Sequence, residues 1–273
     1  MKIFSQAALL STQRVMQQNQ NKLEIAMKQL ASGNRFANSS VDAAGQAIAE
    51  NIKAQVKGMD AATANAENAT SLVQHAEGAL NEQNNILIRM RELAVQAASD
   101  TYSSVEREFI NYEFEQINSE LDRIAKTTRF GSQNLLDGSE RTYEFQVGSD
   151  SNSSSRIVYQ QDANTTGSEL GVDGLSVDSQ SSARDALDSI DSALEQISGA
   201  RAKMGAVQSR LEFAINNNQS QKENLASAYS KLADTDVAQA FTEMRRAQIL
   251  QQYQVAVLAN ANDSQGYALK LIA

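Results

Sequence analysis

Apolar residues recur at alternating three- and four-residue steps along most of the chain, the spacing that aligns side chains on one face of an α-helix. The clearest run consists of Ile110, Phe114, Ile117, Leu121 and Ile124. Sustained alternation of this kind is the heptad pattern of coiled coils, in which one helix buries its apolar stripe against another. The pattern recurs on both sides of this run, so it predicts three long helices, over about 42–98, 104–128 and 181–232.

Helical spacing is lost between the second and third of these helices. The stretch "RTYEFQVGSD" alternates as a strand does, and "SSRIVYQQD" could pair with it as a hairpin. The rest of the segment over about 130–180 is rich in Ser, Gly and Asp, which favours loops. We therefore interpret the segment as a surface connection with a small β-hairpin rather than as a dedicated binding site.

Two breaks separate the ends of the chain from these helices. In "LASGNRFANSSVDAAG", Gly33 and Asn34 can end a helix, and Asp42 can cap the next one. The stretch "KLADTDVAQAF" interrupts the helical pattern in a similar way near the other end. We predict an N-terminal helical arm over 1–41, a rod over 42–233 and a C-terminal helical arm over 234–273. The predicted fold is mainly α: a long antiparallel helical bundle with a small β-hairpin region and terminal arms.

Each predicted arm carries a narrow apolar stripe flanked by Gln and Asn. The candidate assembly residues on these stripes are Leu9, Met16, Leu23 and Leu30 in the first arm, and Phe241, Met244, Ile249, Leu250 and Leu258 in the second. So few large side chains cannot offset the conformational entropy lost on ordering an arm, and isolated helices are marginal in water. We expect each arm to be largely disordered alone and helical when packed against other arms, including those of neighbouring copies.

Composition supports long helices and excludes several classes of partner. The 273 residues include no Pro, which would interrupt a helix, and no Cys, which excludes disulfides. The net charge of −9 argues against nucleic-acid binding, for which a basic stripe is expected. No apolar run approaches the roughly 18 residues of a membrane span, so we expect no membrane insertion. The first residues lack a cleavable secretory signal, and we therefore expect export by another route.

Residues for catalysis or metal binding are scarce. His75 is the only histidine, and it lacks the second histidine of a helical zinc motif. The glycines of "GARAKMGAVQSR" lie in a helical pattern and do not form a phosphate-binding loop. The carboxylates fall on the polar faces of the predicted helices. We expect no enzyme, no catalytic residue, no cofactor and no metal site.

Long motifs in a fixed order point to one family. The first stretch shares Leu30, Ser32, Gly33, Arg35, Asp42, Ala43, Ala44 and Gly45 with the family pattern L-S-S-G-x-R-I-N-S-A-x-D-D-A-A-G. Further matches are "RMRELAVQAAS", "TTRFGSQNLLDG" followed by "FQVG", "RAKMGAVQSRLEFAINN" and "LADTDVAQAFTEMRRAQILQQYQVAVLANAN". On these motifs the chain resembles bacterial flagellin, the subunit of the flagellar filament, over nearly its whole length.

The chain also departs from the family pattern. Val41 stands where the pattern has the first Asp of a pair, and Phe36 and Ala37 replace the usual Ile-Asn. These changes bear on packing near the end of the first arm. Because only a short segment separates the two recognisable halves, the large outer domains of many flagellins are expected to be absent.

The resemblance implies an assembly and a route out of the cell. In flagellins the two arms form an inner tube domain that is disordered in the free monomer, and the rods form a surrounding layer. The chain is then expected to be exported by the flagellar type III route, with an export chaperone, and to polymerise with itself and other flagellins. Hook-associated and cap proteins are further expected partners, and the product is an extracellular filament for swimming.

The resemblance also identifies candidate receptor residues. Toll-like receptors recognise some flagellins at positions that match Arg89, Leu93 and Gln96, which share a helix face, and Glu113. We interpret packing in the filament as the main role of these residues. Ile117 stands where several recognised flagellins carry a basic residue, which argues against strong receptor activity.

Three other functions remain as alternatives. A hook–filament junction protein shares the terminal arms, although "RELAVQAAS" and "TTRFGSQNLLDG" favour flagellin. A flagellin with a catalytic insert is disfavoured by the short middle segment and the single histidine. A free coiled-coil adaptor would form a soluble oligomer of fixed size, whereas a filament subunit should polymerise on seeds.

Overall fold

The computed structural model describes residues 2–36, 38 and 42–270, with side chains described over 10–36, 38 and 42–260. Its helices are α1 (Lys2–Ser32), α2 (Ala43–Ala97), α3 (Ser104–Thr127), α4 (Gln180–Ala233) and α5 (Val237–Lys270). The prediction of a mainly helical fold is therefore confirmed, and the helix ends lie close to those expected from the heptad pattern. Among the described residues, contacts divide the chain into two compact units.

The first of these, which we call the bundle unit, spans Lys57–Lys222. The second, which we call the arm unit, combines Met1–Val56 with Glu223–Ala273. The division falls inside α2 and inside α4, so each of these helices contributes to both units. The two breaks predicted from the sequence coincide with helix ends. The boundaries between the two units lie elsewhere, within the continuous helices α2 and α4.

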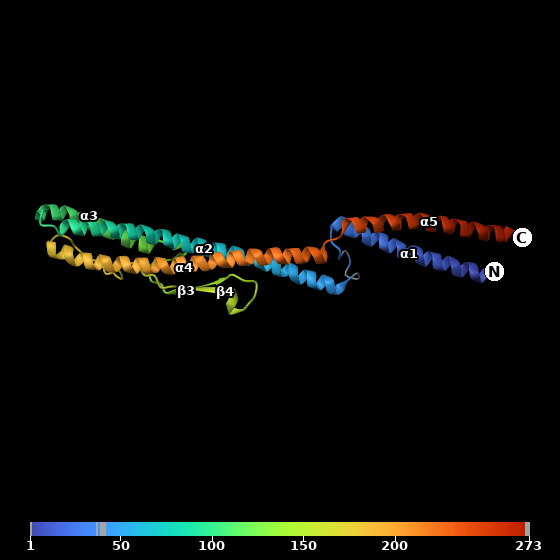
Figure 1. Cartoon of the computed structure of the whole chain (residues 1–273), viewed down its shortest axis with the longest axis horizontal. Helices are drawn as coiled ribbons and strands as arrows, with labels where there is room; N and C mark the ends of the chain where they lie inside the picture. Colours follow the sequence, from blue (N-terminus) through green and yellow to red (C-terminus); the bar gives the residue numbers. More distant parts are fainter. Residues whose placement is uncertain (1, 37, 39–41, 271–273) are drawn as a thin grey trace. The chain divides into compact units, whose positions relative to one another are not determined.

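The bundle unit is built around the heptad stripes of α2, α3 and α4, which run alongside one another (Figure 1). Its largest buried side chains are Leu80, Leu87, Met90 and Leu93 on α2, Phe114 and Leu121 on α3, and Ile190, Ile197, Met204 and Leu211 on α4. None of them is more than 2% exposed. Full burial of one such side chain stabilises the fold by about 1.5–3 kcal/mol, so this core is the main source of stability of the bundle unit.

The turn between α2 and α3 is closed by side chains that bind backbone groups. Ser103 and Glu106 form a capping box, in which the Ser103 N–H donates to the Glu106 carboxylate at 2.7 Å. Arg107 donates to the carbonyl oxygens of Ala97 at 2.8 Å and Ser99 at 2.9 Å. Because the last carbonyls of a helix lack partners within it, this cation completes the end of α2.

The middle segment contains two small antiparallel sheets. The predicted hairpin is formed by β3 (Arg141–Gln146) and β4 (Arg156–Gln161), with Tyr143 opposite Tyr159 and Phe145 opposite Ile157. A second ladder, β1 (Arg129–Phe130) with β2 (Gln133–Asn134), closes around Gly131 at φ 62°. This second ladder was not predicted from the sequence, because two-residue strands carry no alternation.

This segment contributes to the core as well as to the surface. Its buried side chains are Leu135, Leu136, Val147, Ile157, Tyr159, Ala163, Leu170, Val172 and Val177. Burial raises the pKa of Tyr159 to about 12, because an apolar environment disfavours the phenolate. The interpretation as a surface connection was therefore incomplete: the segment covers part of the helical stripes.

Side-chain amides from the helices bind the backbone of this segment. Gln83 on α2, which is fully buried, donates to the Leu121 carbonyl at 3.2 Å and the Thr165 carbonyl at 3.3 Å. Asn218 on α4 donates to the Val147 carbonyl at 2.8 Å. Because irregular backbone lacks ladder partners, these amides satisfy groups that would otherwise be buried without hydrogen bonds.

Candidate assembly surface

The arm unit contains a pair of helices, α1 and α5, that lie side by side (Figure 1). The residues buried between them are small or polar: Asn19 and Ala26 on α1, and Ala240 and Ala247 on α5. The Asn19 side chain donates to the Ala247 carbonyl at 2.8 Å. We call these four residues the arm seam. Little apolar area is removed from water along it, so its contribution to stability is small.

The predicted assembly residues lie beside or away from the arm seam. Met16, Leu23, Leu30, Met244 and Leu258 are half-buried, and Phe241, Ile249 and Leu250 are exposed. Leu9 belongs to α1, but its side chain lies outside the described part of the chain. The seven-residue spacing located the correct side of α1, whereas its alternate heptad positions, Asn19 and Ala26, are the ones that are buried. Small side chains fill these positions because they permit two helices to approach closely.

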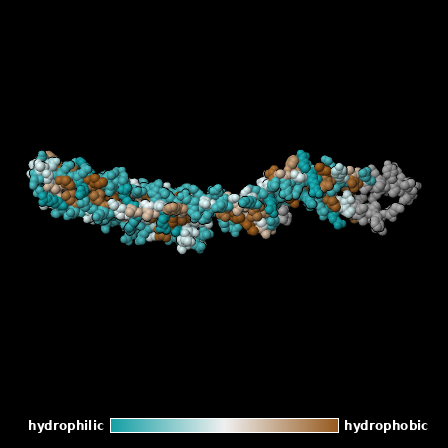
Figure 2. Space-filling model, in the orientation of Figure 1, coloured by the Kyte–Doolittle hydropathy of each residue, from teal (hydrophilic) through white to brown (hydrophobic). Residues whose placement is uncertain are grey.

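Large apolar side chains consequently remain exposed on both arm helices. Those between 41% and 68% exposed are Leu10, Val15 and Met27 on α1, and Val237, Phe241, Ile249, Leu250, Tyr253, Val255 and Val257 on α5. Apolar residues are visible at the surface over both units (Figure 2). An extended apolar surface of this kind is typical of a protein–protein contact site.

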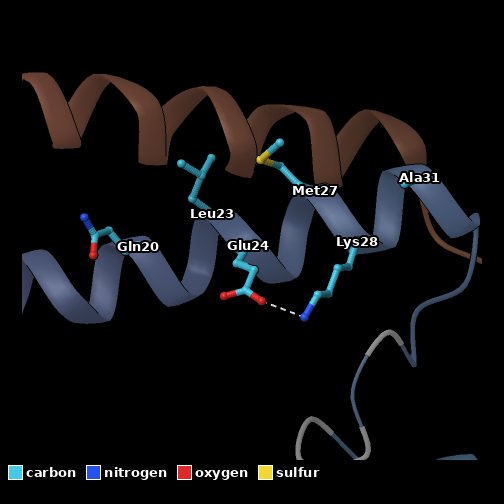
Figure 3. Close-up of a pocket in the computed structure, with 6 residues that line it drawn as sticks. All are labelled: Gln20, Leu23, Glu24, Met27, Lys28 and Ala31. Carbon is cyan, nitrogen blue, oxygen red and sulfur yellow. Dashed lines mark hydrogen bonds and ion pairs between the residues drawn. The ribbon is translucent and has the colours of Figure 1, made fainter.

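A shallow apolar groove runs along α1 within this surface. Its lining residues are Gln20, Leu23, Glu24, Met27, Lys28 and Ala31. Leu23 and Met27 extend to the same side of the helix, and Glu24 and Lys28 extend away from them as an ion pair at 2.6 Å (Figure 3). Leu23, Met27 and Ala31 follow one another at one-turn steps along it, the spacing at which side chains of a second helix pack between those of the first.

The end of α1 and the start of α5 are joined by backbone hydrogen bonds. The Arg35 N–H donates to the Ala233 carbonyl at 2.7 Å, and the Thr235 N–H donates to the Gly33 carbonyl at 3.0 Å. Gly33 adopts φ 68°, the left-handed conformation that ends a helix. The two breaks seen in the sequence therefore form one junction.

Phe36 and Gly45, two positions of the motif around the first break, pack close together at this junction. Phe36 is 8% exposed and packs with Ala49 and Ala233. Asp42 caps α2 by accepting from the Gly45 N–H at 2.8 Å. A Cβ at Gly45 would lie 2.5 Å from the Asp42 carboxylate and 3.0 Å from the Phe36 ring, so a larger residue there would displace the capping side chain. Val41 and Ala37 lie outside the described residues.

The candidate receptor residues are not all on one surface. Arg89 binds Glu113 at 2.7 Å and Glu92 at 3.0 Å, and both Arg89 and Glu113 are exposed. The hydrogen bond that Arg89 donates to Glu113 raises the pKa of Arg89 above its ordinary value. Gln96 is also exposed, whereas Leu93 is 2% exposed and belongs to the core of the bundle unit. Leu93 is therefore not accessible in the single chain, and the receptor role of these residues stays a prediction.

Other kinds of site receive no support within the described residues. Over that part of the chain, no group of three or more His, Cys, Asp or Glu residues could hold a metal ion. His75 is exposed on α2. Among the described helices, none combines the length and the apolar character that a membrane span requires.

Family comparisons cover both ends of the chain. The bacterial flagellin N-terminal helical region matches residues 3–141, and the bacterial flagellin C-terminal helical region matches residues 187–272. The intervening 142–186 contain the β-hairpin and the loops of the bundle unit.

Individual relatives match at nearly full length. A flagellin from Halalkalibacterium halodurans is 38% identical over 264 residues, covering 96% of each chain. A flagellin from Bacillus subtilis is 33% identical over 307 aligned residues, covering 100% of each chain. A flagellar filament 30.7 kDa core protein from Treponema maltophilum is 34% identical, covering 93% of each chain.

Solved structures show the same fold over a smaller part. The crystal structure of Bacillus cereus flagellin is similar with a TM-score of 0.51 at 29% identity, covering 61% of this chain and 94% of that one. A putative flagellar hook-associated protein from Vibrio parahaemolyticus is similar with a TM-score of 0.61, covering 71% of this chain and 100% of that one. Its identity is 14%, so that likeness concerns the fold alone.

Proposed function

The chain belongs to the bacterial flagellin family. We propose that its arm unit drives polymerisation. The chain is a structural subunit of the flagellar filament, an extracellular assembly of many copies, and it lacks the large outer domains of longer flagellins. The finer proposal is that α1 and α5 become fully ordered when neighbouring copies cover their exposed apolar residues.

The observation that carries this proposal is the distribution of apolar side chains in the arm unit. The arm seam contains Ala and Asn, while Phe241, Ile249 and Leu250 are exposed. Burying several such side chains per subunit contributes about 1.5–3 kcal/mol each, which adds to the helical hydrogen bonds and shifts the balance toward ordered helices. Contacts that repeat from copy to copy without closing into a ring produce an open helical filament.

The bundle unit offers a second surface for contacts between copies. Val105, Phe109 and Tyr112 lie at i, i+4 and i+7 on α3 and are 57%, 65% and 57% exposed. Their position on the face opposite Phe114 supports a role in packing between neighbouring bundle units. We propose that this face contributes lateral contacts that are weaker than those of the arms.

Other partners follow from the proposed role. A filament subunit requires an export chaperone, hook-associated proteins at its base and a cap at the growing end, and we propose that this chain uses all three. Passage in an unfolded state through the flagellar type III channel suits a chain with no Cys. We expect no catalytic activity and no cofactor.

The hook–filament junction alternative is not favoured. Full-length relatives at more than 30% identity carry the names flagellin and filament core protein. The hook-associated relative matches at 14% identity, which concerns the fold.

Recognition by a toll-like receptor stays a separate prediction. The exposed Arg89–Glu113 pair and Gln96 support it, because they present accessible polar groups on neighbouring helices. The core position of Leu93 counts against it.

Seeded polymerisation tests the proposed function. Purified chain is added to short filament fragments and followed by light scattering and electron microscopy. We expect filaments that elongate from the seeds. A soluble oligomer of fixed size that ignores the seeds would instead identify a coiled-coil adaptor and contradict the proposal.

A further inference from the structure

The outer face of α3 carries a second heptad stripe, on the side away from the core of the bundle unit. Its members, which follow one another at alternating four- and three-residue steps and are all exposed, are Val105, Phe109, Tyr112, Gln116 and Ser119. The buried stripe of the same helix, which includes Phe114 and Leu121, already provides its packing within the chain. Heptad spacing on a solvent face is typical of a helix that packs against another helix. We call this second stripe the α3 outer stripe.

A similar stripe lies on the outer face of α4. Its members, at alternating three- and four-residue steps and all exposed, are Gly199, Ala202, Ala206, Ser209 and Phe213. Phe213 is 72% exposed. Gly199 lowers the helix propensity of α4, yet a Cβ there would meet no neighbouring group within 4 Å. Packing within the chain therefore gives no reason for the glycine, whereas close approach of a second helix does. We call this stripe the α4 outer stripe.

Side-chain sizes along the two outer stripes are complementary when the helices run parallel. In that arrangement the large Tyr112 falls opposite the small Ala206, and Phe213 falls opposite Ser119. Large residues opposite small ones allow side chains to insert between those of the facing helix. An antiparallel arrangement would instead place Phe213 opposite Val105, where two large side chains would meet.

Charges beside the two outer stripes have opposite signs. Glu108 and Glu115 flank the α3 outer stripe seven residues apart, and neither forms an ion pair within the described part of the chain. Lys203 and Arg210 flank the α4 outer stripe at the same interval. Lys203 binds Asp162, whereas Arg210 has no ionic partner among the described residues. Residues that flank a heptad stripe form salt bridges between helices and select the partner, so these two faces suit each other.

We propose that the α3 outer stripe of one copy packs on the α4 outer stripe of a neighbouring copy, with Glu115 of one chain facing Arg210 of the other. The inference rests on the proposed function, because it names the surface that covers α3 in the filament. A contact between two different faces leaves one free face of each kind after every addition. It therefore extends into an open array rather than closing as a dimer.

The pairing also predicts how neighbouring copies are offset. α3 and α4 begin at the same end of the bundle unit, where Gln180 donates to the Ala98 carbonyl at 3.0 Å and to the Asp100 side chain at 2.9 Å (Figure 1). Copies that point the same way thus bring α3 of one parallel to α4 of the next. Tyr112 lies 8 residues after the start of α3, and Ala206 lies 26 residues after the start of α4. At about 1.5 Å per residue, the difference predicts a stagger of roughly 27 Å along the bundle.

Disulfide trapping in filaments tests the pairing. The chain has no Cys, so introduced cysteines are the only ones present. Copies with Tyr112→Cys are mixed with copies carrying Ala206→Cys, grown on seeds and treated with a mild oxidant, and peptide mass spectrometry identifies the joined peptides. In the matched control, Glu195→Cys replaces Ala206→Cys. Glu195 is exposed on the same face of α4 but about 16 Å away, beyond the reach of a disulfide.

We expect covalent dimers that join the two peptides in the first mixture and none in the control mixture. Filaments of the first mixture without such dimers would overturn the inference. Equal yields of dimers from both mixtures would also overturn it, because they would show that the two faces meet without a fixed register.

Exchange of the facing charges provides a second test. Arg210→Glu places two anions opposite each other, and we expect the critical concentration for filament growth to rise about fivefold. The double variant Glu115→Arg/Arg210→Glu should restore it. Arg129→Glu makes the same change of charge at an exposed position of β1, outside both stripes, and should leave the critical concentration within about twofold. Circular dichroism checks that each variant is folded. A rise that the double variant does not reverse, or an equal rise in Arg129→Glu, would contradict the pairing.

The two proposals fail in distinguishable ways. Wild type that does not grow on seeds would contradict the proposed function, and the inference with it. Normal growth of wild type, with neither the disulfide nor the rescue by the double variant, would contradict the inference alone. The outer face of α3 would then belong to a partner other than a copy of this chain, or to a different face of that copy.

Discussion

The bundle unit and the arm unit both follow heptad spacing, yet different residue types occupy their buried positions. In the bundle unit the buried positions hold Leu87, Phe114, Ile190 and similar side chains at 2% exposure or less. In the arm seam they hold Asn19 and three alanines, while large apolar residues such as Ile249 are exposed. Spacing therefore decides that a segment is helical, and the size of the buried residues decides whether the chain alone can stabilise it.

The same contrast separates two kinds of stability. The bundle unit removes its large apolar side chains from water within one molecule, so its stability should not depend on concentration. The arm unit leaves comparable side chains for other copies, so its stability should rise with concentration and with polymerisation. The following predictions test this distinction, from the largest expected effect to the smallest.

Deletion of residues 236–273 should abolish polymerisation while most of the helicity of the bundle unit remains. The deletion removes α5 and with it the partner of α1, but it leaves the core between α2, α3 and α4 intact. Seeded growth measures the first effect, and far-ultraviolet circular dichroism measures the second. Normal filaments from the shortened chain would refute the role assigned to the arms.

Phe114→Ala should destabilise the bundle unit by about 3–5 kcal/mol, because the ring is fully buried and its removal leaves a cavity. Phe109→Ala is the matched control on the same helix. Phe109 is 65% exposed, so its truncation should change the free energy of unfolding by no more than about 0.5 kcal/mol. Denaturant unfolding of the free chain measures both. Similar losses for the two variants would show that α3 does not pack as described.

Asn19→Ala should raise the critical concentration for filament growth about fivefold, because it removes one buried hydrogen bond from the arm seam. The Asn19 amide donates to the Ala247 carbonyl and, at 3.4 Å, to the Gln254 side chain. A polar residue in an apolar seam also selects one register, so some filaments of this variant should be irregular in electron micrographs. Asn21→Ala, at an exposed position of the same helix, is the control. An equal rise in the control would contradict a specific role for Asn19.

Asp191→Asn should lower the thermal midpoint of the bundle unit only slightly. Asp191 binds Arg91 at 2.7 Å across α4 and α2, and both side chains are about half exposed, so solvent screens the pair. The hydrogen bond from Arg91 lowers the pKa of Asp191 below its ordinary value of 3.8. The contribution is therefore present above that value and is lost as the pH falls through the lower pKa of the folded chain.

The difference between wild type and Asp191→Asn should accordingly vanish in acid. Glu195→Gln removes an exposed carboxylate from the same helix and serves as the control at each pH. A difference that persists unchanged after Asp191 is protonated would mean that the substitution acts through something other than the ion pair.

Sequence reasoning could predict the helices, because each long stripe of Leu, Ile and Phe carries heptad spacing that few other structures share. It could also predict the β3–β4 hairpin from alternation. It could not predict that Gln83 and Asn218 hold the backbone of the middle segment by hydrogen bonds. Gln and Asn are usually exposed, and the sequence does not show which carbonyl groups they meet.

The assembly surface was predictable only in part. Met16, Asn19, Leu23, Ala26 and Leu30 step by 3, 4, 3 and 4, so the arm seam was present in the pattern. The large apolar side chains alone did not identify the arm seam, because Asn19 is polar and the Ala26 side chain is small. Leu93 shows a second limit: the family motif selected it as a candidate receptor residue, but it did not show that Leu93 belongs to the core of the bundle unit.

Hydrogen exchange of the dilute free chain and of the filament tests the central claim most directly. The account predicts that amides of α1 and α5 exchange rapidly in the free chain, while those of α2 and α4 beside the bundle core are protected. All of these helices should be protected in the filament. Full protection of α1 and α5 in the dilute free chain would contradict the claim that neighbouring copies complete the arm unit.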